Sequence, residues 1–551
     1  MSLGAKHQPR GPGGRLLGPQ RGCEQARGPR CADRGRPGQR CPPAGCALGR
    51  PAPGARPGPR PPRFGRFCAP ALAPAAALAL ALAQGCAPAP DAPATVLLMT
   101  LDSVRRDHVS AYGRRSAFDP EARTTPNFDR LAAAGILFER AYSSTSWTLP
   151  AHATLLTGLP DQIHGATRND RHIPAAVETL AECFAAGGYR TQGFFSGPNL
   201  HPAFGFAQGF ERYQDCSGVE VPAELFAAPQ EAGRDDRFLG VHVASHQVRT
   251  SPILLASIEE FLATDLGPQE RCFLFVHWWD PHYDYLAPPE QVARFANPHY
   301  SGRLSGRFVQ DKFGPWAPPD LEHLLALYDA EIAYTDEHVG RLLARLALLG
   351  RERDLLVALT SDHGEEFYEH GRWGHQRTLY DEVLAIPMLL SWPAAWPAGQ
   401  RVAEPVQLID LFATLLSAAR LPVPAASESL DLARLFQGSD PGRRELFFHL
   451  DAPQREIRLD ALQQGSRKLI VGADGSEPSF FDLERDPGER AEARPLRPGT
   501  EAADLYQRLG QELARRRALH ASAGHLEAGA GAEFGPDLRA ALEAAGYLLN
   551  D

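Results

Sequence analysis

The chain has 551 residues, 43% of them hydrophobic and 22% charged, which is ordinary for a globular protein and too long for one small core. The net charge of −9 is unevenly spread, because residues 1–67 hold 14 Lys or Arg against 2 Asp or Glu and leave 43 basic and 64 acidic residues for the rest. An acidic body of this kind repels a phosphate backbone, so composition argues against nucleic acid as its partner.

Residues 1–62 are dominated by Gly, Pro, Arg and Ala and carry almost no large apolar side chains. A segment with so little apolar surface cannot form a core, so we predict that it is disordered. Two interpretations stay open for it. It is either a basic arm that binds nucleic acid or a stretch translated from a start set upstream of the true one.

Residues 63–86 read as a secretion signal. A basic start at Arg63 and Arg66 precedes an apolar stretch at 67–83, and small residues come before Cys86. This order is typical of a lipoprotein signal, so we expect export to the periplasm or outer cell surface and membrane attachment through a lipid on Cys86. Simple cleavage and secretion, or a short spanning helix, are the alternatives. The later cysteines permit one disulfide at most, among Cys183, Cys216 and Cys272.

Residues 94–420 are expected to form the catalytic domain. The apolar run at 94–101 has the length of a strand buried on both faces, which is typical of the centre of a parallel sheet. Thr124, Thr125 and Pro126 begin a predicted helix that ends before Gly135. Further predicted strands alternate with helices: strands at 190–196, 272–276 and 355–360, and helices at 176–186, 253–262 and 321–349. The alternation predicts an α/β fold with a doubly wound, mostly parallel sheet flanked by helices.

The pattern changes after a further predicted helix at 406–418. Residues 421–429 are rich in Pro, Ala and Ser, and strand-like segments follow at 445–449 and 468–471. We therefore predict a smaller C-terminal α+β subdomain at 421–551, with a surface loop near 521–532.

Acidic and histidine side chains follow three of the predicted strands. Asp102 follows the first, Asp280 and His282 follow the strand at 272–276, and Asp362 and His363 follow the strand at 355–360. Because ligands bind at the carboxyl ends of strands in open α/β sheets, these side chains can converge on one site. A lone Asp at a strand end is more often a helix cap or turn residue, so no single cluster decides the matter.

Thr148 is the candidate nucleophile. It stands two residues before Pro150, which can open a short helix whose free N–H groups and dipole favour negative charge. Two carboxylates and an imidazole, from Asp102, Asp362 and His363, would make four ligands for a divalent metal ion together with the Thr148 alkoxide. The metal would hold the hydroxyl deprotonated and act as a Lewis acid. The structural alternative for Thr148 is a helix N-cap.

Three histidines are candidates for contact with the substrate. His282 and His375 can donate hydrogen bonds to a tetrahedral anion, protonate a leaving oxygen or bind a second metal. His152, one turn after Thr148, either faces the anion or only packs. As isolated residues, histidines of this kind are more often structural, and we expect His164 to be so.

The ordered segments resemble the sulfatase family within the alkaline phosphatase superfamily. The segment at 146–158 is similar to the family signature Cys/Ser-x-Pro-Ser-Arg followed by Leu-Thr-Gly, in which the first residue is oxidised to formylglycine. Threonine cannot undergo that oxidation, and His152 stands at the position of the Arg. Other matching segments lie at 100–108, 280–282, 360–366, 373–375, 380–382, 386–387 and 481–489.

The resemblance implies a metal site at Asp102, Asp362 and His363, with Thr148 at the nucleophile position. Many calcium-dependent members have Asp where Ser103 stands and Asn where His363 stands. This site therefore has fewer hard oxygen ligands and one nitrogen more, which favours zinc or manganese over calcium.

The resemblance also implies a hydrolase of sulfuric or phosphoric (phosphonic) esters that forms a covalent threonyl ester at Thr148, with His282 and His375 around the substrate anion. Water must release that ester by direct attack, which phosphate tolerates better than sulfate, so a phosphorus ester is favoured. Thr148 is also similar to the nucleophile of phosphoethanolamine transferases and lipoteichoic acid synthases. A phosphoethanolamine- or phosphoglycerol-type transferase is therefore one alternative, and an inactive surface-displayed binding protein is another. A small-molecule, glycan or lipid ester is the expected substrate.

Overall fold

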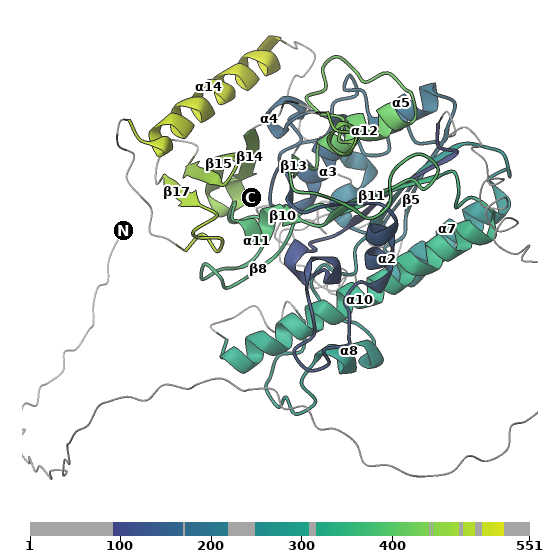
Figure 1. Cartoon of the computed structure of the whole chain (residues 1–551), viewed down its shortest axis with the longest axis horizontal. Coiled ribbons are helices and arrows are strands. Elements are labelled where there is room, and N and C mark those ends of the chain that lie inside the picture. The colour runs from purple at the N-terminus through teal and green to yellow at the C-terminus, as the bar shows by residue number, and fades with distance from the viewer. Residues whose placement is uncertain are drawn as a thin grey trace, which may run out of the picture. The chain divides into compact units, whose positions relative to one another are not determined.

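The computed structural model describes residues 92–522 apart from 169–170, 219–247, 308–315, 440–441, 443–444, 473–477, 491–496 and 498 (Figure 1). The predicted disordered segment at 1–62, the predicted signal at 63–86 with Cys86, and most of the predicted loop at 521–532 lie outside these residues. Within the described part, every helix is too short or too polar to cross a lipid bilayer. The cysteines Cys183, Cys216 and Cys272 are buried and free, so they do not form the one disulfide that three cysteines permit.

The central sheet has eight strands in the order β12-β2-β11-β7-β1-β6-β4-β5. The middle strand β1 pairs in parallel with β6 and β7, while β11 runs antiparallel to both of its neighbours. This arrangement confirms the predicted mostly parallel α/β sheet. The strands are β1 (Thr95–Leu101), β2 (Ile136–Phe138), β4 (Arg190–Phe195), β5 (Arg212–Asp215), β6 (Cys272–Trp278), β7 (Leu355–Ser361), β11 (Met388–Ser391) and β12 (Gln400–Val402).

Strand β1 is buried along its whole length because helices cover both faces of the sheet. Val96 and Leu98 belong to one hydrophobic cluster and Leu97 and Met99 to another, since successive side chains of a strand point to opposite faces. The first cluster is closed by α3 (Thr148–Thr157), α5 (Leu180–Ala186) and α12 (Asp410–Ala418), and the second by α2 (Pro126–Ala134), α7 (Ser251–Thr264) and α10 (Pro318–Leu348) (Figure 1).

Two predicted helices begin later than expected. The segment predicted as a helix at 406–418 starts as the short strand β13 (Val406–Gln407), which pairs with β3 (Ala141–Tyr142), and becomes helical only at Asp410. The helix predicted at 176–186 begins at Leu180, because Thr179 and Glu182 form a capping box at its N-terminus. A strand pairing sets the first boundary and a capping box sets the second, and apolar periodicity reveals neither.

The C-terminal part contains a four-stranded antiparallel sheet covered by one helix. Its strands are β14 (Glu445–Ala452), β15 (Ile457–Gln464), β16 (Arg467–Gly472) and β17 (Ser479–Asp482), and α14 (Glu501–Ser522) packs against them through Leu505 and Leu509. The sequence predicts β14 and β16, but it does not predict β15, in which polar side chains are as numerous as apolar ones. Shorter elements are α4 (Asp161–His164), α8 (Pro289–Phe295), α11 (Asp381–Leu384), α13 (Ala433–Phe436), β8 (Glu366–Phe367), β9 (Trp373–Gly374) and β10 (Ala385–Ile386).

Candidate active site

The carboxyl ends of β1 and β7 place two carboxylates beside each other. Leu101 and Ser361 are paired in the parallel register of these strands, and Asp102 and Asp362 are the residues that follow them. Both carboxylates and the His363 imidazole are fully buried. The convergence expected at the strand ends is therefore present, and it results directly from the register of neighbouring strands.

Serine residues hold the two carboxylates in place. Ser103 has a left-handed backbone with a φ of 58°, and its N–H donates to Asp362 Oδ1 at 3.1 Å. Its hydroxyl donates to Asp102 Oδ1 at 2.5 Å. On the neighbouring strand, the Ser361 hydroxyl accepts from the Val104 N–H at 2.9 Å. A strained non-glycine residue that binds both carboxylates is typical of a functional site.

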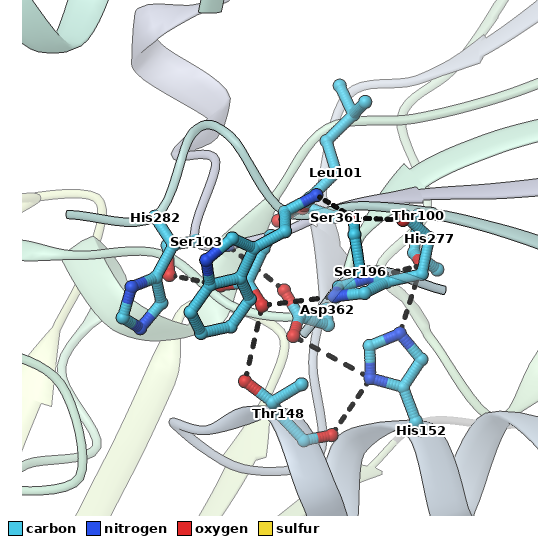
Figure 2. Close-up of polar contacts among 12 residues, drawn as sticks. Thr100, Leu101, Ser103, Thr148, His152, Ser196, His277, His282, Ser361 and Asp362 are labelled. Carbon is cyan, nitrogen blue, oxygen red and sulfur yellow. Dashed lines mark hydrogen bonds and ion pairs between the residues drawn. The ribbon is translucent and has the colours of Figure 1, made fainter. Parts of the chain in front are cut away.

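Helix α3 brings Thr148 to the carboxylates. The helix begins at Thr148 after the extended residue Trp147, and it ends at Gly158, whose φ is 64°. Thr148 Oγ1 lies 3.4 Å from Asp102 Oδ2 and 3.3 Å from His363 Nε2. The side chain is fully buried and is not the N-cap of the helix, because Trp147 occupies that position. Figure 2 shows Thr148 and His152 pointing from the helix toward the strand ends.

The side chains of Asp102, Asp362 and His363 fit a divalent metal ion. One potential ligand atom from each of them lies within 4.8 Å of the others. His363 Nδ1 lies 2.8 Å from the Gly364 carbonyl, which can only accept, so the lone pair of the neutral ring is on Nε2, facing the cluster. Asp362 Oδ2 has no hydrogen-bond partner among the described residues. Burial raises the pKa of Asp102 to about 6, although His363, Ser103 and Thr148 oppose the shift. A cation would offset the cost of burying these carboxylates.

His277 extends this set, and the sequence reasoning missed it. His152 Nδ1 lies 2.9 Å from the Thr148 carbonyl, so Nδ1 carries the proton, and burial lowers the pKa of His152 to about 3 and keeps the ring neutral. His152 Nε2 therefore accepts from Thr100 Oγ1 at 2.9 Å, and this hydroxyl in turn accepts from His277 Nδ1 at 3.0 Å.

The bare nitrogen of His277 then faces a carboxylate. His277 Nε2 lies 3.3 Å from Asp102 Oδ2 and has no hydrogen-bond partner in the described part of the chain. Burial also lowers the pKa of His277 to about 4, so the ring is neutral. A lone pair beside a carboxylate oxygen is a suitable pair of ligands for one cation. One signal was available in the sequence, since an imidazole stands in the otherwise apolar run of β6, opposite Thr100.

His375 and His282 lie next to His363. The ring centroid of His375 is 4.6 Å from that of His363 and 5.2 Å from that of His282. His375 Nδ1 contacts Glu365 Oε1 at 3.0 Å, and His282 is stacked on Trp279 with a centroid separation of 3.9 Å. Burial, followed by the neighbouring His363 and His282, holds the pKa of His375 well below its usual range. These imidazoles line one side of the site, where they can contact a bound ester.

Asp280 does not join the site. Its carboxylate accepts from the Thr250 N–H at 2.6 Å and from the Ser251 N–H at 2.9 Å, so it caps the start of α7. Asp280 is therefore a helix cap, which is the alternative role of an Asp that follows a strand. His164 contacts Thr154 and Asp161 inside the protein, which agrees with the structural role expected for it.

Known proteins agree with this architecture. The model of the family named Sulfatase matches residues 94–421, and the model named N-sulphoglucosamine sulphohydrolase, C-terminal, matches residues 368–518. Arylsulfatase A of Homo sapiens is 27% identical over 462 residues, which cover 72% of this chain and 82% of that protein. N-acetylglucosamine-6-O-sulfatase of Bacteroides thetaiotaomicron is 23% identical, with 72% of this chain and 81% of that protein covered.

A solved structure shares the fold. The phosphonate monoester hydrolase of Agrobacterium radiobacter superposes with a TM-score of 0.60 at 22% identity, and the match covers 78% of this chain and 96% of that one. The family model alone spans more than half of the chain. The chain therefore belongs to the sulfatase family of ester hydrolases, whose catalytic fold it carries at residues 94–421.

Proposed function

We propose that this chain hydrolyses monoesters of phosphoric, phosphonic or sulfuric acid, with Thr148 as the nucleophile and a divalent metal ion held by Asp102, Asp362 and His363. One observation carries the proposal. Thr148 Oγ1 lies within 3.4 Å of Asp102 Oδ2 and 3.3 Å of His363 Nε2, at the N-terminus of a helix and away from solvent. A hydroxyl in this position has both an orienting carboxylate and a favourable helix dipole.

Several groups of the chain act in the first step, in which the threonyl ester forms. Asp102 and His363 orient Thr148 Oγ1 for in-line attack on phosphorus or sulfur, and N–H groups at the start of α3 face the equatorial oxygens. A bound metal ion would supply positive charge that favours the deprotonated hydroxyl and the developing charge on those oxygens. The P–O or S–O bond to the leaving group breaks as the threonyl ester forms, and the proton that leaves the Thr148 hydroxyl passes to the departing oxygen through the neutral imidazole of His375.

Water completes the reaction. The attacking water forms the new bond to phosphorus or sulfur as the ester bond to Thr148 Oγ1 breaks, and the neutral His375 passes the proton of the water back to Thr148 Oγ1. Threonine has no route of release by elimination of the kind that a formylglycine hydrate has. We therefore propose that phosphorus monoesters react faster than sulfate esters, and that zinc or manganese serves better than calcium because the donor set contains imidazole.

The experiment is a substrate panel assayed with defined metals. The protein is stripped with a chelator and reloaded separately with zinc, manganese or calcium, and the rates on 4-nitrophenyl sulfate, phosphate, phosphodiester and phenylphosphonate are compared. The proposal expects no turnover by the stripped protein and restored turnover with zinc or manganese. Turnover that survives complete metal removal would contradict the metal site.

Thr148→Ala tests the nucleophile in the same assay. We expect a loss of at least about 10³-fold in kcat with an unchanged fold. Thr145→Ala is the matched control, because Thr145 is equally buried, lies three residues away and uses its hydroxyl in no hydrogen bond in the described structure. A trapped phosphoryl-threonine on residue 148, detected by mass spectrometry after acid quench, would identify the intermediate. Retention of most activity by Thr148→Ala would refute the assignment.

We also propose export with a lipid on Cys86, which the order of basic, apolar and small residues before that cysteine supports. Membrane fractionation of cells that express the full chain and its Cys86→Ser variant tests this. The full chain is expected in the membrane fraction and the variant outside it; equal distribution would contradict lipid attachment.

A further inference from the structure

Three side chains beside His375 carry hydrogen-bond donors and have no anionic partner. Gln376 is fully buried, and its Nε2 amide has no hydrogen-bond partner among the residues that the structure describes. Arg377 and Arg455 are half-buried, and over the described ranges neither guanidinium pairs with a carboxylate within salt-bridge distance. A buried donor without an acceptor is costly, so these groups together mark a place where an acceptor can bind.

The two arginines also repel each other. Burial and the positive charge of Arg455 lower the pKa of Arg377, and these effects outweigh the attraction of Tyr283 and Glu366. Arg455 Nε donates to Gln376 Oε1 at 3.4 Å, so the amide is oriented by one of the two arginines. Like charges held together in a half-buried place are unfavourable unless an anion lies between them.

The position of these groups relates them to the candidate active site. Gln376 and Arg377 follow His375 directly in the chain, and Arg455 ends the turn (Pro453–Arg455) between β14 and β15 of the C-terminal sheet. Both arginines contribute to the lowered pKa of His375, which shows that their charges act on that imidazole. Arg377 also lines an open cavity of about 630 Å³, together with Arg372, Thr378 and Ile457 among others.

We propose that Gln376, Arg377 and Arg455 form a subsite for a second anionic group of the substrate, carried on the leaving-group side of the scissile ester. The inference rests on the proposed function, because it takes His375 as the group that faces the leaving oxygen. Arg377 lies two residues after His375, so their Cα atoms are at most about 7 Å apart, and the second anion belongs on the same ring as the ester or on the next one. The substrate class is therefore an aryl or sugar monoester that carries an additional carboxylate or sulfate.

The chemistry of the three groups suits such an anion. Two guanidinium groups and an amide N–H offer charge-assisted hydrogen bonds to a carboxylate or a sulfate, and arginine matches both geometrically. Arg455 comes from the C-terminal sheet while Gln376 and Arg377 follow β9, so the subsite joins two parts of the chain. Binding of the second anion would compensate the repulsion between the arginines and would satisfy the Gln376 amide.

The test compares three esters that differ only in the second anion. A 4-nitrophenyl ester of the acid that gives the fastest turnover is measured beside its 3-carboxy and 3-sulfo analogues, with the metal-loaded protein. We expect kcat/KM to be about tenfold or more higher for at least one anionic ester, as a charge-assisted hydrogen bond allows. The two anionic arms distinguish a site for carboxylate from one for a sulfur oxyanion.

Variants assign the preference to residues. Arg377→Gln and Arg455→Gln are each expected to lower the ratio of anionic to neutral kcat/KM by about tenfold. The matched control is Arg458→Gln, because Arg458 lines the same cavity but its guanidinium is paired with Asp451 at 2.9 Å. The control is expected to keep the wild-type ratio. A ratio near one for the wild-type protein, or an equal change in the control, would overturn the subsite.

Binding separates failure of the subsite from failure of the proposed function. Calorimetric titration of the Thr148→Ala protein with the neutral and anionic esters requires no catalysis. Tighter binding of an anionic ester by about tenfold, lost in the double variant with Arg377→Gln, supports the subsite even if no ester is hydrolysed. Equal affinities would overturn it, whereas rapid hydrolysis of the neutral ester would leave the proposed function intact.

Discussion

Replacing Thr100 with valine tests the hydrogen-bond relay behind the candidate metal site. Valine has nearly the shape of threonine, so the substitution removes the hydroxyl and little else. The Thr100 hydroxyl contacts His152 Nε2 at 2.9 Å and His277 Nδ1 at 3.0 Å. Without it, both nitrogens become buried polar atoms that have no hydrogen-bond partner. Each such atom costs about 1–3 kcal/mol, so we expect the free energy of unfolding to fall by about 2–6 kcal/mol.

The same substitution should weaken metal binding. The Thr100 hydroxyl fixes the proton of His277 on Nδ1 and thereby keeps the Nε2 lone pair directed toward Asp102. His277 is a neighbour of the proposed ligand Asp102, and loss of a group that holds such an outer partner in place typically lowers metal affinity by about 10–100-fold. Competitive titration of zinc or manganese against a chromophoric chelator measures this directly, and denaturant unfolding of the metal-free protein measures stability separately.

Thr100→Ser is the control for this prediction. Serine keeps the hydroxyl and loses one methyl group, which costs about 1 kcal/mol in a core and leaves both histidines bonded. We therefore expect the serine variant to retain the wild-type metal affinity and to be clearly more stable than the valine variant. If the two variants unfold at the same denaturant concentration and bind metal equally, the relay assigned to Thr100 is wrong.

Three further substitutions test other parts of the structure. Gly364→Ala would place a methyl group 2.1 Å from the Glu382 carbonyl oxygen, and this clash must displace the backbone after His363. We therefore expect a loss of metal affinity in chelator competition. An unchanged affinity would contradict the close packing at Gly364. Lys468→Met leaves the buried Glu489 carboxylate and the partly buried Asp381 carboxylate, each 2.8 Å from the present ammonium, without that cation. The free energy of unfolding should fall by about 3–5 kcal/mol in urea titration, and a fall of less than about 1 kcal/mol would contradict a buried ion pair. His152 is buried neutral, and burial lowers its pKa from 6.5 to about 3, so its contribution is fully present above pH 6.5 and is lost as the pH falls toward 3. The stability of metal-free wild-type protein relative to His152→Gln should therefore decrease over that window, and a pH-independent difference would show that folding does not lower the pKa of His152.

Much of the sheet and part of the site could be predicted because they depend on local patterns. The run that forms β1 is apolar at nearly every position, since helices cover both faces of a central strand, and such a run is recognisable without knowing its neighbours. Asp102, Asp362 and His363 were found because polar side chains directly after buried strands lie at the edge of the sheet where ligands bind. Thr148 was singled out because it stands two residues before Pro150 in a segment that resembles the sulfatase signature, and the helix indeed begins there, at Thr148 itself.

The predictions failed where a local pattern has two outcomes. Apolar residues at 406–418 suit a helix throughout, yet the first two pair with β3 and only Asp410 begins the helix. Strand β15 has as many polar as apolar side chains, and two of the polar ones, Asp460 and Gln463, are buried, so its composition does not identify it as a strand. Asp280 illustrates the same ambiguity for function, since a carboxylate after a strand serves equally well as a ligand or as a helix cap.

The sequence by itself determined the α/β class, the strand-end carboxylates and the hydroxyl of Thr148 at the start of a helix, because each depends on residues close together in the chain. Only the tertiary structure decided the partners. Thr100 and His277 are 177 positions apart and meet because β1 and β6 pair in parallel register. Arg455 reaches Gln376 only because the C-terminal sheet lies against the segment after β9. Strand order and packing determine such contacts between distant residues, and a local pattern of side chains does not predict them.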